Sequence, residues 1–163
     1  MDIIFKWNIK KLADALKISE EDVRIYFTDG RRISFILERR IAIELLNGRI
    51  ADSEGAAFDI FDSEDKKWEV RSLSRYGVYF CPSYMVGSGR HFEEKGFLEK
   101  VSEIEGYFVC DIDLFPEVPI WKITSNQVIK WWREKKLGST TNISRNKGLG
   151  LLKALDESKS IPD

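Results

Sequence analysis

Ala57-Phe58-Asp59-Ile60-Phe61 is the first of two short apolar runs near the middle of the chain, and Trp68-Glu69-Val70-Arg71-Ser72-Leu73 is the second. Both runs are rich in aromatic and β-branched residues, and a polar turn joins them, which predicts an antiparallel hairpin. If the ends of the turn, Asp62 and Lys66, lie opposite each other, Asp59 faces Glu69 with their Cβ atoms roughly 4.5–5.5 Å apart.

The two facing carboxylates repel each other, and hard divalent cations take oxygen ligands. We therefore expect Asp59 and Glu69 to bind a metal ion. The alternative is that one of the two side chains faces solvent and pairs with Lys67 or Arg71.

The composition is that of a globular domain. Of the 163 residues, 43% are hydrophobic and 33% are charged, which allows a real core and is too apolar for disorder. We expect a single domain over 1–163, with a helix and a hairpin at 1–37, a core at 38–136 and a basic arm at 137–163.

Charge is unevenly distributed, although the net charge is only −1. Residues 51–65 hold six acids and no Lys or Arg, whereas residues 122–153 hold eight bases and one acid. An acidic centre beside a basic arm suits a polyanionic substrate that is met by a metal ion. Two solvated surfaces of opposite sign would give the same pattern.

Cysteine and histidine content excludes a standard zinc site. The two cysteines, Cys81 and Cys110, form no CxxC pair, and His91 is the only histidine. We see no signal peptide and no apolar span of about 20 residues, so we expect a reduced, cytoplasmic protein with no membrane partner.

Hydrophobic periodicity and turn residues predict an α/β or α+β fold with a mixed central sheet flanked by helices. The predicted helices cover 9–16, 38–47, 90–104 and 128–136, with a weak helix at 151–155. The predicted strands cover 23–27 and 33–37 as an N-terminal hairpin, the central hairpin, 77–80, 107–112 and 119–123. The basic segment from 138 to about 150 is expected to be a mobile arm.

From about residue 38 to 136, the chain resembles the PD-(D/E)xK nuclease superfamily, which includes many type II restriction endonucleases. The core of that family is a helix, a three-stranded meander, a helix and a strand, with one metal-binding acid on the second strand and an acid-x-lysine pair on the third. Asp59 matches the first acid and Glu69-Val70-Arg71 the pair, and the run 54–59 looks like the small-residue approach to that acid. The resemblance implies a restriction endonuclease-like core.

Two positions depart from the family pattern. Phe58 stands where proline is frequent, and Arg71 stands where lysine is expected. Arginine can donate hydrogen bonds to a phosphate but effectively never loses its proton. The resemblance then implies that a metal-bound hydroxide attacks while Arg71 stabilises charge on the phosphate. By strand parity, Lys67 shares a face with Glu69 and Arg71.

The resemblance implies Mg²⁺ as the cofactor, with Mn²⁺ as a substitute. Asp59, Glu69 and the backbone carbonyl of Val70 would be its ligands. Glu44, on the preceding helix, would be a supplementary catalytic acid, and Glu38 is a weaker candidate for that role. An ordinary surface glutamate is the other interpretation of Glu44.

DNA contacts are expected mainly from the segment that follows the second acidic strand. Its phosphate or base-edge donors are Arg75, Ser83, Tyr84, Ser88, Arg90 and His91. Three further bases could follow the DNA backbone: Lys130, Arg145 and Lys147. A polar surface loop and a solvated helix face are the respective alternatives.

The favoured function is a Mg²⁺-dependent endonuclease that cuts double-stranded DNA as a homodimer, since two strands call for two sites. A DNA-binding protein without activity is the alternative, as a degenerate nuclease fold or as a helix-turn-helix over 12–27. Helical structure in residues 1–50 would favour the helix-turn-helix. A third possibility is an α+β protein with no nucleic-acid partner.

Overall fold

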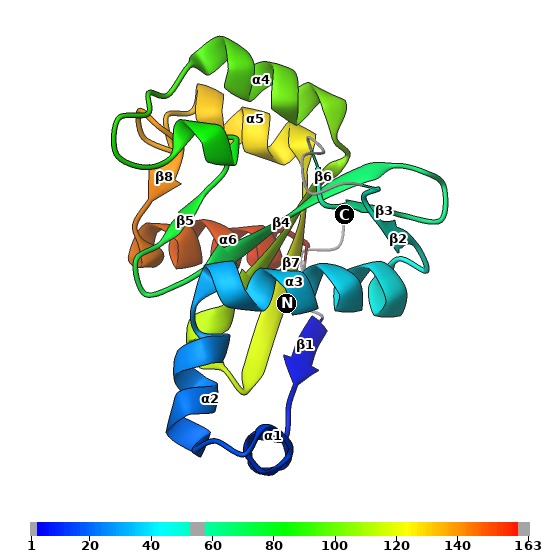
Figure 1. Ribbon diagram of the computed structural model, residues 1–163. Coiled ribbons are helices and arrows are strands. Elements are labelled where there is room, and N and C mark those ends of the chain that lie inside the picture. Colours follow the sequence, from blue (N-terminus) through cyan, green and yellow to red (C-terminus); the bar gives the residue numbers. More distant parts are fainter. Residues whose placement is uncertain (1–2, 53–57, 160–163) are drawn as a thin grey trace.

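The computed structural model describes residues 3–52 and 58–159 and has a mixed α+β fold built on a six-stranded sheet (Figure 1). The sheet order is β1-β7-β6-β4-β3-β2. Its strands are β1 (Ile3–Lys6), β2 (Arg49–Ile50), β3 (Ile60–Phe61), β4 (Lys67–Leu73), β6 (Gly106–Asp111) and β7 (Glu117–Thr124). Two short strands, β5 (Val78–Tyr79) and β8 (Asn142–Ile143), pair separately.

Six α-helices surround the sheet: α1 (Ile9–Leu16), α2 (Glu20–Phe27), α3 (Gly30–Arg40), α4 (Glu94–Glu103), α5 (Ser125–Arg133) and α6 (Arg145–Lys159). A π-helical turn, η1 (Ile41–Leu45), continues α3, and the 3₁₀ turns η2 (Ser83–Met85) and η3 (Ile112–Leu114) follow later. In the described part of the chain, none of these helices has the length and apolar character needed to cross a membrane.

Pairing within the sheet is antiparallel except at its centre. Strands β2, β3 and β4 form an antiparallel meander, and β4 then pairs with β6 in parallel. The parallel pairing requires a crossover, which runs through β5, η2 and α4 (Figure 1). The predicted α+β class with a mixed sheet is therefore confirmed.

The helices form two layers, and each layer packs on its own face of the sheet. Ala13 of α1, Val23 of α2 and Ile33 of α3 share a core with Trp68 and Val70 of β4. On the other face, Leu73 of β4 shares a core with residues of α4, α5 and α6. Because side chains alternate along a strand, Glu69 and Arg71 point to the α4 side.

The register of the central hairpin is the one that the sequence predicts. Ile60 pairs with Trp68, and the Asp62 amide donates to the Lys66 carbonyl at 3.0 Å. The ladder ends at the pair of Ile60 and Trp68, because the Asp59 amide donates to the Trp68 carbonyl at 3.1 Å, so Asp59 and Glu69 lie near each other at the open end of the hairpin without forming a ladder pair. Residues 53–57, which include most of the predicted small-residue approach to Asp59, lie outside the described residues.

The predicted N-terminal hairpin is wrong, because residues 23–27 and 33–37 lie in helices α2 and α3. Ser19 and Asp22 form a reciprocal capping box at the start of α2, and the Asp29 side chain accepts from the Arg31 amide at the start of α3. The buried residues of both helices recur at i, i+4, so caps and packing outweigh the β propensity of these segments.

The predicted mobile C-terminal arm is also wrong. Residues 142–143 form β8 against β5, and α6 begins at Arg145 and packs Leu152 into the core on the α4 side. Strand β5, expected near 77–80, pairs with β8 and not with the main sheet. The helix expected over 90–104 begins at Glu94.

Candidate active site

Asp59 lies where the central hairpin opens. The Asp59 amide donates to the Trp68 carbonyl at 3.1 Å, and its carbonyl accepts from the Ala51 amide at 2.8 Å. Beyond this point, a side chain takes the place of the backbone hydrogen bonds between the two strands: the Oδ2 atom of Asp59 accepts a 2.7 Å hydrogen bond from the Val70 amide. The carboxylate is thereby fixed at the edge of β4.

Glu69 is held by two cations. It is 5% exposed, its Oε1 lies 2.6 Å from Arg71 Nη1, and its Oε2 lies 2.5 Å from Lys100 Nζ. Among the described residues, Oε2 is in this ion pair but accepts no hydrogen bond of regular geometry. Both oxygens therefore have a positive partner, and Oε2 retains hydrogen-bonding capacity that the fold does not use.

Arg71 is buried and fixed on three sides. Its Nη2 donates to the Cys81 carbonyl at 3.2 Å, its Nη1 donates to the Val70 carbonyl at 3.4 Å, and its guanidinium lies 4.8 Å from the Tyr79 ring centroid. Its Nε has no hydrogen-bond partner in the described structure. The guanidinium is thus a positioned positive charge with one donor to spare.

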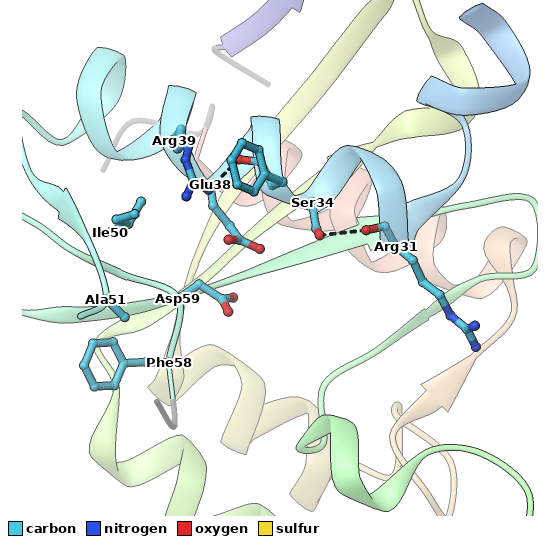
Figure 2. Close-up of a pocket in the computed structure, with 9 residues that line it drawn as sticks. Arg31, Ser34, Glu38, Arg39, Ile50, Ala51, Phe58 and Asp59 are labelled. Atoms are coloured by element: carbon cyan, nitrogen blue, oxygen red, sulfur yellow. Dashed lines mark hydrogen bonds between the residues drawn. The ribbon is translucent and has the colours of Figure 1, made fainter. Parts of the chain in front are cut away.

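Glu38 joins the two acids from the α3 side. Figure 2 shows the carboxylates of Glu38 and Asp59 pointing into the same space. Burial and then the charge of Asp59 raise the pKa of Glu38 to about 7. Burial and then the charge of Glu69 raise the pKa of Asp59 to about 6. The three carboxylates therefore lie near enough for their charges to interact.

The acids line a wide groove with two connected parts. The larger part, of about 1550 Å³, contains Asp59, Glu69 and Arg71, and the smaller, of about 360 Å³, contains Phe35 and Arg39. Four residues belong to the lining of both parts: Arg31, Ser34, Glu38 and Asp59. The carboxylate cluster therefore lies where the two parts meet.

The structure brings some of the expected DNA-contact residues to this groove. Four of them line it: Arg75, Ser83, Tyr84 and Arg90. Five others lie outside the lining of both parts as described: Ser88, His91, Lys130, Arg145 and Lys147. Arg145 has a structural partner, since its guanidinium donates to both oxygens of buried Asp111 at 2.6 and 2.8 Å.

Two side chains that the sequence suggested for the site, Glu44 and Lys67, are not part of the groove lining. Glu44 accepts hydrogen bonds from Arg40 at 2.6 and 2.9 Å and lies outside the groove lining, whereas Glu38 lines both parts of the groove. Lys67 is exposed, with its Nζ 5.1 Å from the Phe58 ring centroid.

Lys100 is the residue that sequence reasoning missed. It is 9% exposed on α4, between the buried residues Phe97 and Val101. A lysine within a buried helical stripe is unusual unless it is paired, because burial of a charge is costly. The position of Lys100 among the buried residues of this helix was therefore the sequence signal that could have identified it.

The oxygen donors at the site fit Mg²⁺ in kind. In the parts of the chain described, no three or more His, Cys, Asp or Glu side chains form a group that could hold a metal ion. Mg²⁺ is usually bound by one or two carboxylates and keeps several waters. Asp59, Glu69 and the Val70 carbonyl, whose second lone pair is not used by Arg71, match that need.

Comparisons of the chain with protein-family models, with curated proteins and with solved structures find no match. The functional argument therefore depends on the geometry and chemistry of the groove.

The raised pKa values predict how stability depends on pH without metal. Folding raises the pKa of Glu38 from 4.5 to about 7 and that of Asp59 from 3.8 to about 6. The folded state then binds more protons than the unfolded state, so their stabilising contribution is present below about pH 4 and is lost as the pH rises through 6 to 7. Melting in EDTA from pH 5 to 8 should show this decline.

Glu38→Gln is expected to make that decline shallower. At pH 8, the variant should melt higher than the wild type by about 2–4 °C, the shift that roughly 1 kcal/mol produces in a protein of this size. Glu44→Gln is the matched control, because Glu44 lies outside the groove and its pKa is lowered by its hydrogen bond to Arg40. An identical pH profile for wild type and Glu38→Gln would contradict the proposed electrostatic cost.

Proposed function

We propose that the protein is a Mg²⁺-dependent DNA endonuclease of the PD-(D/E)xK type. The observation that carries the proposal is the groove itself, which Asp59 and Glu69 both line, with Arg71 2.6 Å from Glu69. The element order supports it, since α3, the meander β2–β4, α4 and the parallel strand β6 follow one another in the sequence that this family uses.

In the proposed mechanism, Asp59, Glu69 and the Val70 carbonyl hold the metal ion at the edge of β4. When bound, Mg²⁺ lowers the pKa of a coordinated water and neutralises the phosphate. Arg71 donates to the phosphate oxygens and stabilises the charge that develops on them. Glu38, across the space from Asp59, is placed to orient the attacking water.

Lys100 provides the amine that the E-x-R element lacks. Its Nζ lies 2.5 Å from the Glu69 carboxylate, so α4 supplies an ammonium group beside the proposed E-x-R element. We propose that Lys100 and Arg71 divide the work of the single family lysine.

The wild-type protein tests the function directly. Incubated with mixed plasmid and phage DNAs, it should give discrete fragments in Mg²⁺ or Mn²⁺ and none in EDTA. Since one site cuts one strand, duplex cleavage is expected from a homodimer, which sedimentation would detect. DNA binding without cleavage would point instead to a degenerate nuclease fold, and no binding even at low salt would exclude a nucleic-acid partner.

A helix-turn-helix is the second candidate, and the helical structure of residues 9–40 favours it more than the predicted hairpin did. Helices α1 and α2 are joined by a short turn, and Ile25 and Tyr26 of α2 are exposed. However, the first turn of α2 contains Glu20, Glu21 and Asp22. A recognition helix places its N-terminal residues against the DNA, where three acids are repelled by phosphates.

A further inference from the structure

A rigid turn at the far end of β4 presents an exposed tyrosine to the groove. Ser74 and Gly77 exchange backbone hydrogen bonds at 3.1 and 3.0 Å, and the Ser74 hydroxyl accepts from the Tyr76 amide at 3.2 Å. Gly77 has a φ of +117°, which favours glycine. The turn therefore holds Arg75 and Tyr76 in a defined position.

Tyr76 is 83% exposed, and Tyr84, on η2, is 64% exposed. Both line the same groove as Asp59 and Glu69. Tyr84 lies against Gly96 of α4, where an added Cβ would come within 3.2 Å of its hydroxyl oxygen. Two aromatic rings thus remain accessible in a groove that otherwise holds many charged side chains.

Positive charge accompanies both rings. The Arg75 guanidinium lies 5.5 Å from the Tyr76 ring centroid. Arg90 donates to the Ser83 and Val86 carbonyls at 2.9 and 3.1 Å, on either side of Tyr84. An aromatic face with an adjacent cation is a combination that binds a nucleotide, since the base stacks and the phosphate is neutralised.

The tyrosine lies some distance from the acids. The four steps along β4 from Glu69 to Leu73 span about 13 Å at the usual rise of a strand, and the turn extends this further. A ligand that reaches both places must therefore be several nucleotides long. In a paired duplex, neighbouring bases cover each base face, so an aromatic ring can stack only on a base that is unpaired.

We propose that the groove accepts DNA with unpaired bases beside the phosphate to be cleaved, and that Tyr76 stacks on one of them. This inference depends on the proposed endonuclease function for its substrate, because the same groove holds the carboxylate cluster. Tyr76 is the specificity-determining residue, and Arg75 neutralises the adjacent phosphate.

The test compares two DNA duplexes of the same sequence, one fully paired and one with a central four-nucleotide bubble that contains 2-aminopurine. Binding is measured in Ca²⁺ by anisotropy and by 2-aminopurine fluorescence, so no cleavage is needed. The wild type should bind the bubble about tenfold more tightly and quench the probe. Tyr76→Ala should lose most of both effects, whereas Tyr76→Phe should keep them.

Tyr26→Ala is the matched control, because Tyr26 is an exposed tyrosine on α2 outside the groove lining. It should leave the bubble preference unchanged, and a loss as large as that of Tyr76→Ala would overturn the proposal in favour of α2. Equal wild-type affinity for both duplexes, or an unchanged quench in Tyr76→Ala, would also overturn it.

The experiment distinguishes failure of the stacking proposal from failure of the endonuclease proposal. If the wild type prefers and quenches the bubble but cuts no DNA, the stacking role stands and the cleavage proposal fails. If it cuts fully paired and bubble DNA equally well and shows no preference in binding, the cleavage proposal stands and the unpaired-base proposal fails.

Discussion

Asp59→Asn is expected to abolish Mg²⁺-dependent DNA cleavage, with a loss of about a thousandfold or more. The substitution removes a charged metal ligand, and metal-ion stabilisation of the transition state contributes several kcal/mol, at tenfold for each 1.4 kcal/mol. An asparagine Oδ1 can still accept the hydrogen bond from the Val70 amide, so the edge of β4 should keep its structure. Cleavage is followed by gel assay under single-turnover conditions.

The thermal stability of Asp59→Asn should rise, although its cleavage activity falls. Burial and the charge of Glu69 raise the pKa of Asp59 to about 6, so the ionised side chain is unfavourable above that pH. In EDTA at pH 8, Asp59→Asn should therefore melt above the wild type, and its DNA affinity in Ca²⁺ should stay within about threefold. Retained cleavage in this variant would reject the endonuclease proposal.

Glu44→Gln and Glu38→Gln complete the comparison. Glu44 is bound to Arg40 outside the groove, so its substitution should leave cleavage unchanged. Glu38 shares the space with Asp59, so its substitution should slow cleavage (Figure 2). If Glu44→Gln slowed cleavage and Glu38→Gln did not, Glu44 would be the supplementary catalytic acid.

Arg145→Met is expected to lower the free energy of unfolding by about 3–5 kcal/mol. The substitution leaves the carboxylate of Asp111, which is 0% exposed, without the arginine that donates to both of its oxygens. Removal of one partner from a buried ion pair has a cost of this size. Urea denaturation followed by tryptophan fluorescence measures it.

Two further variants separate a structural role from a role in DNA binding. Lys147→Met alters an exposed base on the same helix and should leave stability within about 0.5 kcal/mol. Asp111→Asn combined with Arg145→Met removes the unpaired charge and should recover part of the loss. If Arg145→Met keeps full stability but weakens DNA binding, Arg145 is a DNA contact, as its sequence context predicts.

The central hairpin could be predicted because its information is local. A short polar turn between two runs of β-forming residues allows few ways of pairing the two strands. A shift of the pairing by one residue would expose the buried side chains and bury the exposed ones. The register from Ile60 to Lys67 could therefore be predicted from the sequence, but the position of Asp59, whose amide donates to the Trp68 carbonyl at the end of the ladder, could not. The strands near 107–112 and 119–123 were predictable for the same reason, since β6 is buried throughout and β7 is buried from Val118 to Ile123 except at Lys122.

Helix α1 was predicted at its observed bounds, whereas α2 and α3 were mispredicted because two local signals conflict. Residues 23–27 have β-branched and aromatic side chains, yet Ser19 and Asp22 cap a helix, and Val23 and Phe27 pack on its buried face. Packing against the sheet decides between the two, and it is not visible in a local window.

Lys100 and Arg145 depend on contacts between segments far apart in the chain. Lys100 meets Glu69 from 31 residues away, and Arg145 meets Asp111 from 34 residues away. No spacing rule relates such pairs, so only the tertiary structure could bring Lys100 to Glu69 and pair Arg145, a predicted DNA contact, with Asp111.

The contact between Lys100 and Glu69 has a thermodynamic consequence for the whole α4 layer. Any ligand that competes for the Oε2 atom must weaken the attachment of α4 to β4, and by reciprocity anything that loosens this helix must alter the affinity for that ligand by the same free energy. Residues that merely seat the helix, such as Trp132, whose indole donates to Glu94 at 2.7 Å, then become remote modulators of occupancy.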